Sequence, residues 1–125
     1  MNRAPENFEV RPNYSYYRPT GQVSLEQATQ LMTRALEYAL AQNIKKLLVN
    51  ATDLAMPIPT LPDRFFAVRE WAQVAGGRVR LSVVLSPEII DPEKFGVLVA
   101  RNAGLMANIF TSEPEALEWL LSNRE

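Results

Sequence analysis

The segment at residues 45 to 66, KKLLVNATDLAMPIPTLPDRFF, constrains the fold more than any other part of the chain. Leu47, Leu48 and Val49 form an apolar run that is too short for a helix and too apolar for a surface strand, which is typical of a central parallel strand. A corner containing three prolines follows the run, and a helical pattern begins near Thr60. Because sites in open α/β sheets form at the carboxyl ends of strands, this corner is the expected location of a functional site.

Strand and helix patterns alternate along the rest of the chain. Apolar or alternating stretches predict about five strands, at residues 8 to 11, 14 to 18, 47 to 51, 79 to 85 and 106 to 110. Capping residues predict helices that begin at Ser24, at Thr60 or Pro62, at Asp91 and at Ser112. We therefore expect a single α/β domain over residues 1 to 125. It would have one mostly parallel sheet, an antiparallel N-terminal edge hairpin and four helices.

Composition excludes several classes of function. Thirteen basic and fourteen acidic residues give a net charge of −1, so no overall field attracts nucleic acid. The chain has no cysteine and no histidine, which excludes disulfides, thiolate chemistry and imidazole-dependent catalysis or metal binding. No apolar run is long enough for a membrane span, and the polar first fifteen residues do not resemble a signal peptide. We expect a cytoplasmic protein with no cofactor, no metal, no nucleic-acid partner and no stable membrane insertion.

Short patterns spread over residues 8 to 122 resemble those of STAS-like domains. The patterns are Gly21-Gln22-Val23-Ser24, Lys46-Leu47-Leu48-Val49-Asn50-Ala51, Asn102-Ala103-Gly104 before Asn108-Ile109-Phe110, and the closing Glu115-Ala116-Leu117-Glu118-Trp119-Leu120. They are similar to the STAS-like family related to bacterial anti-sigma-factor antagonists (SpoIIAA-like), with a distant likeness to lipid-carrying CRAL-TRIO domains. The resemblance implies a STAS-like fold and a bacterial regulatory module that acts by protein–protein interaction.

The resemblance also implies a modification site near Thr60. Antagonists of that family are switched by phosphorylation of a serine at the start of the helix after the central strand. This chain lacks the family's acidic-Ser-Ser-Gly signature and carries Pro57-Ile58-Pro59-Thr60 in its place. Thr60 is a possible phosphoacceptor, and the simpler interpretation is that its hydroxyl caps the helix.

Apolar side chains in the corner predict a binding surface. Loops normally avoid a set such as Met56, Ile58 and Leu61 unless the side chains are buried or contact a partner. The prolines keep the loop stiff, which reduces the entropy lost on binding. The residues expected to contact a partner or ligand are Asp53, Met56, Ile58, Thr60, Leu61, Arg64 and Phe65. The alternative, without a binding role, is a lid packed over the end of the sheet.

Three functions follow from these patterns. The leading expectation is a non-enzymatic module that docks a protein partner through residues 53 to 65. The alternative is a carrier of a small apolar ligand or lipid in a pocket between helices and sheet. A weaker alternative is acid–base catalysis by Asp53 and Asp63, although both also fit structural roles. The exposed edge hairpin could also pair two copies into a homodimer.

Overall fold

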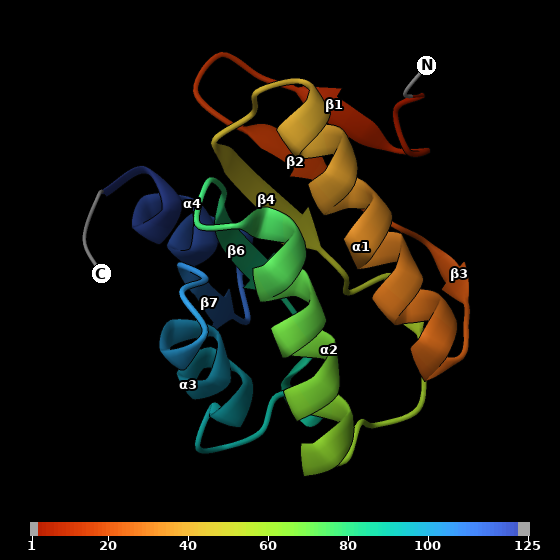
Figure 1. The fold of residues 1–125 in the computed structure, drawn as a ribbon. Helices are drawn as coiled ribbons and strands as arrows, with labels where there is room; N and C mark the ends of the chain where they lie inside the picture. The colour runs from red at the N-terminus through yellow and green to blue at the C-terminus, as the bar shows by residue number, and fades with distance from the viewer. Residues whose placement is uncertain (1–2, 123–125) are drawn as a thin grey trace.

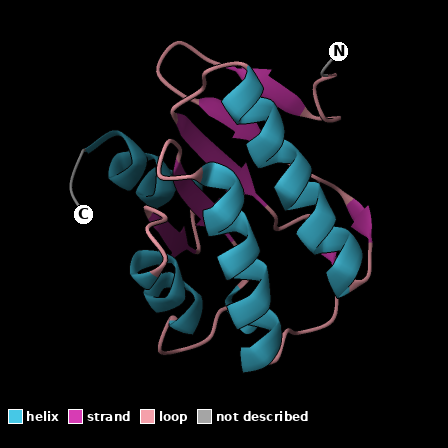
Figure 2. Ribbon diagram, in the orientation of Figure 1, coloured by secondary structure: helices cyan, strands magenta, loops and turns pink. Residues whose placement is uncertain are grey.

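Seven strands and four α-helices follow one another along residues 3 to 122, the part of the chain that the computed structural model describes (Figure 1, Figure 2). The strands are β1 (Phe8–Val10), β2 (Ser15–Tyr17), β3 (Gly21–Gln22), β4 (Lys46–Asn50), β5 (Leu54–Ala55), β6 (Arg80–Val84) and β7 (Ala107–Phe110). The helices are α1 (Leu25–Ala41), α2 (Leu61–Ala75), α3 (Phe95–Asn102) and α4 (Glu113–Ser122), with a short 3₁₀ turn at Pro87–Ile89.

Five of the strands form one sheet in the order β1-β2-β4-β6-β7. The β1–β2 hairpin is antiparallel and lies at one edge, and the three other neighbouring pairs are parallel. The predicted fold class, a mostly parallel sheet with an antiparallel N-terminal edge hairpin and four helices, is confirmed. It was predictable because each parallel neighbour needs a crossover connection, and the helical patterns fall where those connections must be.

The helices cover the two faces of the sheet unequally. Helices α1, α2 and α3 each connect one parallel strand to the next, and because strand order advances in one direction, right-handed crossovers place all three on one face. Figure 1 shows α1 and α2 side by side in front of the sheet. Helix α4 contacts β4, β6 and β7 and packs on the opposite face. The molecule therefore has three layers.

Alternation along the strands divides the interior into two cores. In β4, Leu47 and Val49 belong to the core beneath α1, α2 and α3, whereas Leu48 belongs to the core beneath α4. Successive side chains of a strand point to opposite faces, so Asn50 lies on the same face as Leu48. In β2, Tyr17 and Tyr16 divide between the two cores in the same way. The α4 face is the more polar, because it also holds the buried Asn50.

Two local features differ from the sequence-based expectation. Strands β3 and β5 form a separate parallel pair that the sequence did not predict, because each is only two residues long. The third helix begins at Phe95 and not at the expected proline after Asp91. Lys94 adopts a left-handed conformation with φ of 51°, which interrupts helical geometry before Phe95. Asp91 still acts as a cap, since its carboxylate accepts a hydrogen bond from the Phe95 amide at 2.8 Å.

Candidate functional site

The corner after the central strand is held by hydrogen bonds to the backbone at both of its ends. At its start, Asn50 Oδ1 accepts hydrogen bonds from the Thr52 amide and hydroxyl, at 3.0 and 2.6 Å. At its end, Thr60 Oγ1 accepts from the Asp63 amide at 3.2 Å, and Asp63 Oδ2 accepts from the Thr60 amide at 2.9 Å. This reciprocal capping box begins α2 and confirms the predicted capping role of Thr60. Its possible phosphorylation stays a prediction.

The predicted site residues divide into two groups that lie on different sides of the corner. Met56 and Arg64 are partly buried and line a cavity between the sheet and the helices. Ile58 and Leu61 face solvent, with 61% and 50% of their surface exposed, and Thr60 is also exposed. Phe65 packs against the larger core. The corner is thus neither a simple lid nor a uniformly apolar surface.

The cavity lies between the sheet and helices α1, α2 and α3, on the face that carries the larger core. Its volume is about 160 Å³. Met56 and Pro59 of the corner line it, and most of the remaining lining is aliphatic or aromatic. Apolar lining residues include Leu25, Ala28 and Met32 of α1, Ala67, Val68 and Trp71 of α2, Val97 and Ala100 of α3, and Val49, Leu81 and Val83 of the sheet.

Four charged residues also line this cavity, and three of them are engaged in hydrogen bonds. The Asp63 carboxylate caps α2, the Asp91 carboxylate caps α3, and Lys94 Nζ donates to the Ile109 carbonyl at 3.0 Å. Hydrogen bonds with the Thr60 amide and hydroxyl lower the pKa of Asp63, with a smaller contribution from the charge of Arg64. The fourth residue, Arg64, differs: its Nε is buried and has no hydrogen-bond partner within residues 3 to 122.

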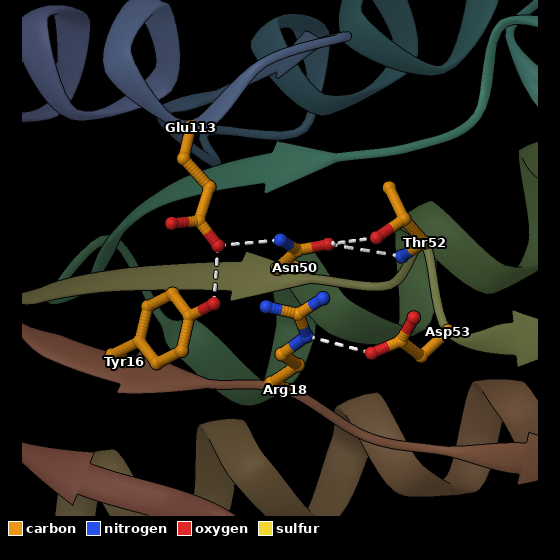
Figure 3. Close-up of polar contacts among 6 residues, drawn as sticks. All are labelled: Tyr16, Arg18, Asn50, Thr52, Asp53 and Glu113. Carbon is orange, nitrogen blue, oxygen red and sulfur yellow. Dashed lines mark hydrogen bonds and ion pairs between the residues drawn. The ribbon is translucent and has the colours of Figure 1, made fainter.

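A second, polar site lies on the α4 face and was not predicted from the sequence (Figure 3). Glu113, the first residue of α4, accepts hydrogen bonds through one carboxylate oxygen from the Tyr16 hydroxyl and from Asn50 Nδ2. Tyr16 and Asn50 are 7% and 5% exposed. These three residues therefore connect β2, β4 and α4 through side-chain hydrogen bonds.

The electrostatics of this polar site keep Glu113 ionised. Burial raises the pKa of the Glu113 carboxyl, but the hydrogen bonds from Tyr16 and Asn50 and the charges of Arg18 and Arg11 outweigh it and lower the pKa overall. The pKa of Tyr16 is raised, first by burial and then by its hydrogen bond to the Glu113 carboxylate. The proton accordingly stays on Tyr16 near neutral pH, and the pair works as an electrostatic link between β2 and α4.

Arginines border the polar site on its open side. Arg18 Nε donates to Asp53 Oδ2 at 2.7 Å, an exposed ion pair that ties the end of β2 to the corner. The Arg11 guanidinium lies 4.2 Å from the centroid of the Tyr16 ring and donates a hydrogen bond to the Tyr14 hydroxyl at 2.7 Å. Of the predicted site residues, Asp53 alone belongs to this side of the molecule. The two aspartates considered for acid–base catalysis therefore have different partners: Asp53 binds Arg18, whereas Asp63 caps α2.

Comparisons with known proteins do not place the chain in a family. No family model matches it, and searches of curated proteins and of solved structures return no match. The resemblance to STAS-like domains therefore stays a prediction.

Between residues 3 and 122, no three Asp or Glu side chains group closely enough to hold a metal ion. No helix in that part of the chain is both long and apolar enough to cross a membrane.

Proposed function

We propose that this chain is a non-enzymatic binding module that holds a small apolar molecule in the cavity beneath the corner. The observation that supports this proposal is the cavity of about 160 Å³, lined mainly by apolar side chains. Protein interiors pack densely and contain few voids larger than a water molecule. An apolar cavity of about 150 Å³ stays dry and can bind benzene. The cavity here is of similar size and partly open to solvent, so a ligand of about that size could enter it and be held by the apolar lining.

The position of the cavity also supports ligand binding. It is bounded by the loop that follows the central strand, in the region where open α/β sheets usually bind ligands. Met56 is an adaptable side chain that can repack around ligands of different shape. Pro59 also lines the cavity, and prolines in this loop limit the entropy lost when a ligand is bound.

Filling the cavity should abolish binding without unfolding the protein. Ala67 lies on α2 and lines the cavity, so Ala67→Leu places about three additional carbon atoms in the space that a ligand would occupy. We expect binding of phenethyl alcohol, a neutral probe with one phenyl ring and one hydroxyl, to weaken at least tenfold, measured by NMR titration. The melting temperature should change little.

Ala41→Leu is the matched control, because Ala41 ends α1, is exposed and does not line the cavity. This variant should bind the probe like the unmodified chain. Native mass spectrometry of protein purified from its own host should also detect a retained small molecule that Ala67→Leu lacks. If Ala67→Leu folds and binds the probe as well as Ala41→Leu does, the proposed function is wrong.

A second candidate function, docking of a protein partner, is favoured by the exposed apolar side chains at the start of α2. Ile58, Leu61 and Phe66 are 61%, 50% and 70% exposed. Several large, exposed apolar side chains within one short segment are a feature of interaction surfaces. Thr60 lies between Ile58 and Leu61 in sequence, so its phosphorylation would add charge to this surface. That modification is the switch that a STAS-like module would need.

The double substitution of Ile58→Ser and Leu61→Ser tests the docking function. We expect it to weaken binding of a partner co-purified from the host at least tenfold, as measured by biolayer interferometry. The melting temperature should hardly change, since both side chains are already exposed. The matched control is Val10→Ser, because Val10 is 69% exposed and lies on β1. Equal partner binding by the double variant and this control would exclude the docking surface.

A further inference from the structure

We propose that the cavity binds a small apolar acid, an aryl or short alkyl carboxylate, whose carboxylate is held by the Arg64 guanidinium. This inference rests on the proposed function, because it names the chemical class of the molecule in the same cavity. It is carried by three observations: an unsatisfied donor on Arg64, the engagement of the other charged groups, and the size of the cavity.

Arg64 carries a donor that lacks an acceptor. Its Nε is buried and makes no hydrogen bond within the part of the chain that the structure describes, while the residue itself lines the cavity. Almost all buried donors in proteins are hydrogen-bonded, so a buried donor without a partner needs an explanation. A ligand carboxylate would supply the missing acceptor, and a guanidinium can bind a carboxylate through two parallel hydrogen bonds.

The other charges at the cavity do not offer an equivalent site. The carboxylates of Asp63 and Asp91 are used as helix caps, and Lys94 Nζ is used by the Ile109 carbonyl. The ion pairs within residues 3 to 122 join Arg11 to Glu9 and Arg18 to Asp53, and none involves Arg64. Arg64 is also in the first turn of α2, where the helix dipole favours an anion. Among these charged groups, Arg64 is therefore the one with a donor still open to a ligand carboxylate.

The size of the cavity restricts the apolar part of the ligand. A volume of about 160 Å³ suits one aromatic ring or a short alkyl chain, by comparison with cavities that take benzene. A long acyl chain would not fit in this volume. A molecule with one ring or about six chain carbons and a single carboxylate matches both the volume and the unsatisfied donor of Arg64.

The experiment compares three probes that share a phenyl ring and differ in charge: phenylacetate, phenethyl alcohol and phenethylamine. Dissociation constants are measured at pH 7 by NMR titration and calorimetry. Phenylacetate should bind at least tenfold more tightly than phenethyl alcohol, because a hydrogen bond between charged groups adds to the shared burial of the ring. Phenethylamine should bind more weakly than the alcohol, because its charge has the same sign as that of Arg64.

Arg64→Gln should remove the preference for the acid and leave the affinity for the alcohol unchanged within about twofold. Arg64→Lys should retain part of the preference, since a lysine keeps the charge and loses the planar fork. Arg69→Gln is the matched control, because Arg69 is an exposed arginine on the same helix that does not line the cavity. It should bind like the unmodified chain. Melting curves identify any variant that fails to fold.

Distinct outcomes separate the two proposals. If phenethyl alcohol binds and phenylacetate binds no better, the cavity is a ligand site and the assignment of an acid is wrong. If Arg64→Gln keeps the full preference for the acid, or if the amine binds most tightly, the role of Arg64 is also wrong. If no probe binds the unmodified chain, the proposed function fails and the inference fails with it. Should Arg64→Gln not fold, the comparison of the three probes on the unmodified chain still decides the ligand class.

Discussion

Replacing Leu120 with alanine is expected to lower the free energy of unfolding by about 3 kcal/mol. Leu120 is fully buried, and with Ala116, Leu48 and Val84 it forms the core between α4 and the sheet. Truncating a buried leucine removes its transfer free energy and leaves a cavity, which together cost about 2–5 kcal/mol. Urea denaturation followed by circular dichroism measures the change.

The neighbouring residue supplies the control. Leu121 is 36% exposed, so Leu121→Ala should cost about 1 kcal/mol or less. The two substitutions remove the same atoms from adjacent positions of one helix, and they differ only in burial. Equal losses of stability in the two variants would show that α4 does not pack on the sheet as described.

Replacing Glu113 with alanine is expected to lower the free energy of unfolding by about 2 kcal/mol. The substitution removes the acceptor shared by the Tyr16 hydroxyl and Asn50 Nδ2, both on buried residues. An unsatisfied buried donor costs about 1–3 kcal/mol, and partial access of water to this open site reduces the sum for two donors. Glu26→Ala, at an exposed first-turn glutamate of α1, is the control and should change stability by less than about 0.5 kcal/mol.

The same carboxyl makes stability depend on pH. Because the pKa of Glu113 is lower in the folded state than its ordinary value, folding favours the ionised form. Its contribution is fully present above the ordinary glutamate pKa and is lost as the pH falls through the lower folded pKa. The stability of the unmodified chain should therefore fall more steeply in acid than that of Glu113→Gln. If the two curves run parallel between about pH 6 and pH 3, Glu113 is not the stabilised anion that the polar site requires.

The polar site gives the α4 face a role in positioning the corner. Glu113 holds Asn50, and the same Asn50 side chain accepts the hydrogen bonds from Thr52 that begin the corner. Arg18, directly after β2, forms an ion pair with Asp53. These contacts fix the start of the loop whose further residues line the cavity on the other face. A substitution at Glu113 is therefore expected to alter the position of the loop that lines the cavity, because Asn50 is hydrogen-bonded to both Glu113 and Thr52.

Local patterns were sufficient for most of the fold. The apolar run at Leu47, Leu48 and Val49 predicted the central strand, and the capping signals at Ser24 and Thr60 predicted the starts of α1 and α2. Such signals depend on neighbours within four residues, so they can be read along the chain. The start of α3 was predicted wrongly, because the capping carboxylate of Asp91 acts across a turn to the amide of Phe95.

The structure separates the corner residues that the sequence analysis grouped into one site. The corner after the central strand was expected to carry the site, and Met56 and Arg64 do line the cavity. Ile58 and Leu61 are equally apolar by sequence, yet they face solvent. Sequence reasoning assigned all of these residues to one surface, because periodicity does not extend through a proline-rich loop. Which loop side chains turn inward depends on where α1 and the sheet leave space.

The amino-acid sequence by itself determined the order of the five main strands and four helices and the capped starts of α1 and α2. These depend on backbone geometry and on contacts between residues close in the chain. Only the tertiary structure decided that Glu113 meets Tyr16, 97 positions away, and Asn50, 63 positions away. Only it decided that three helices and the sheet leave a cavity beside Arg64. Both results depend on how separate elements pack, and that packing is set by the fit of whole surfaces and not by any local pattern.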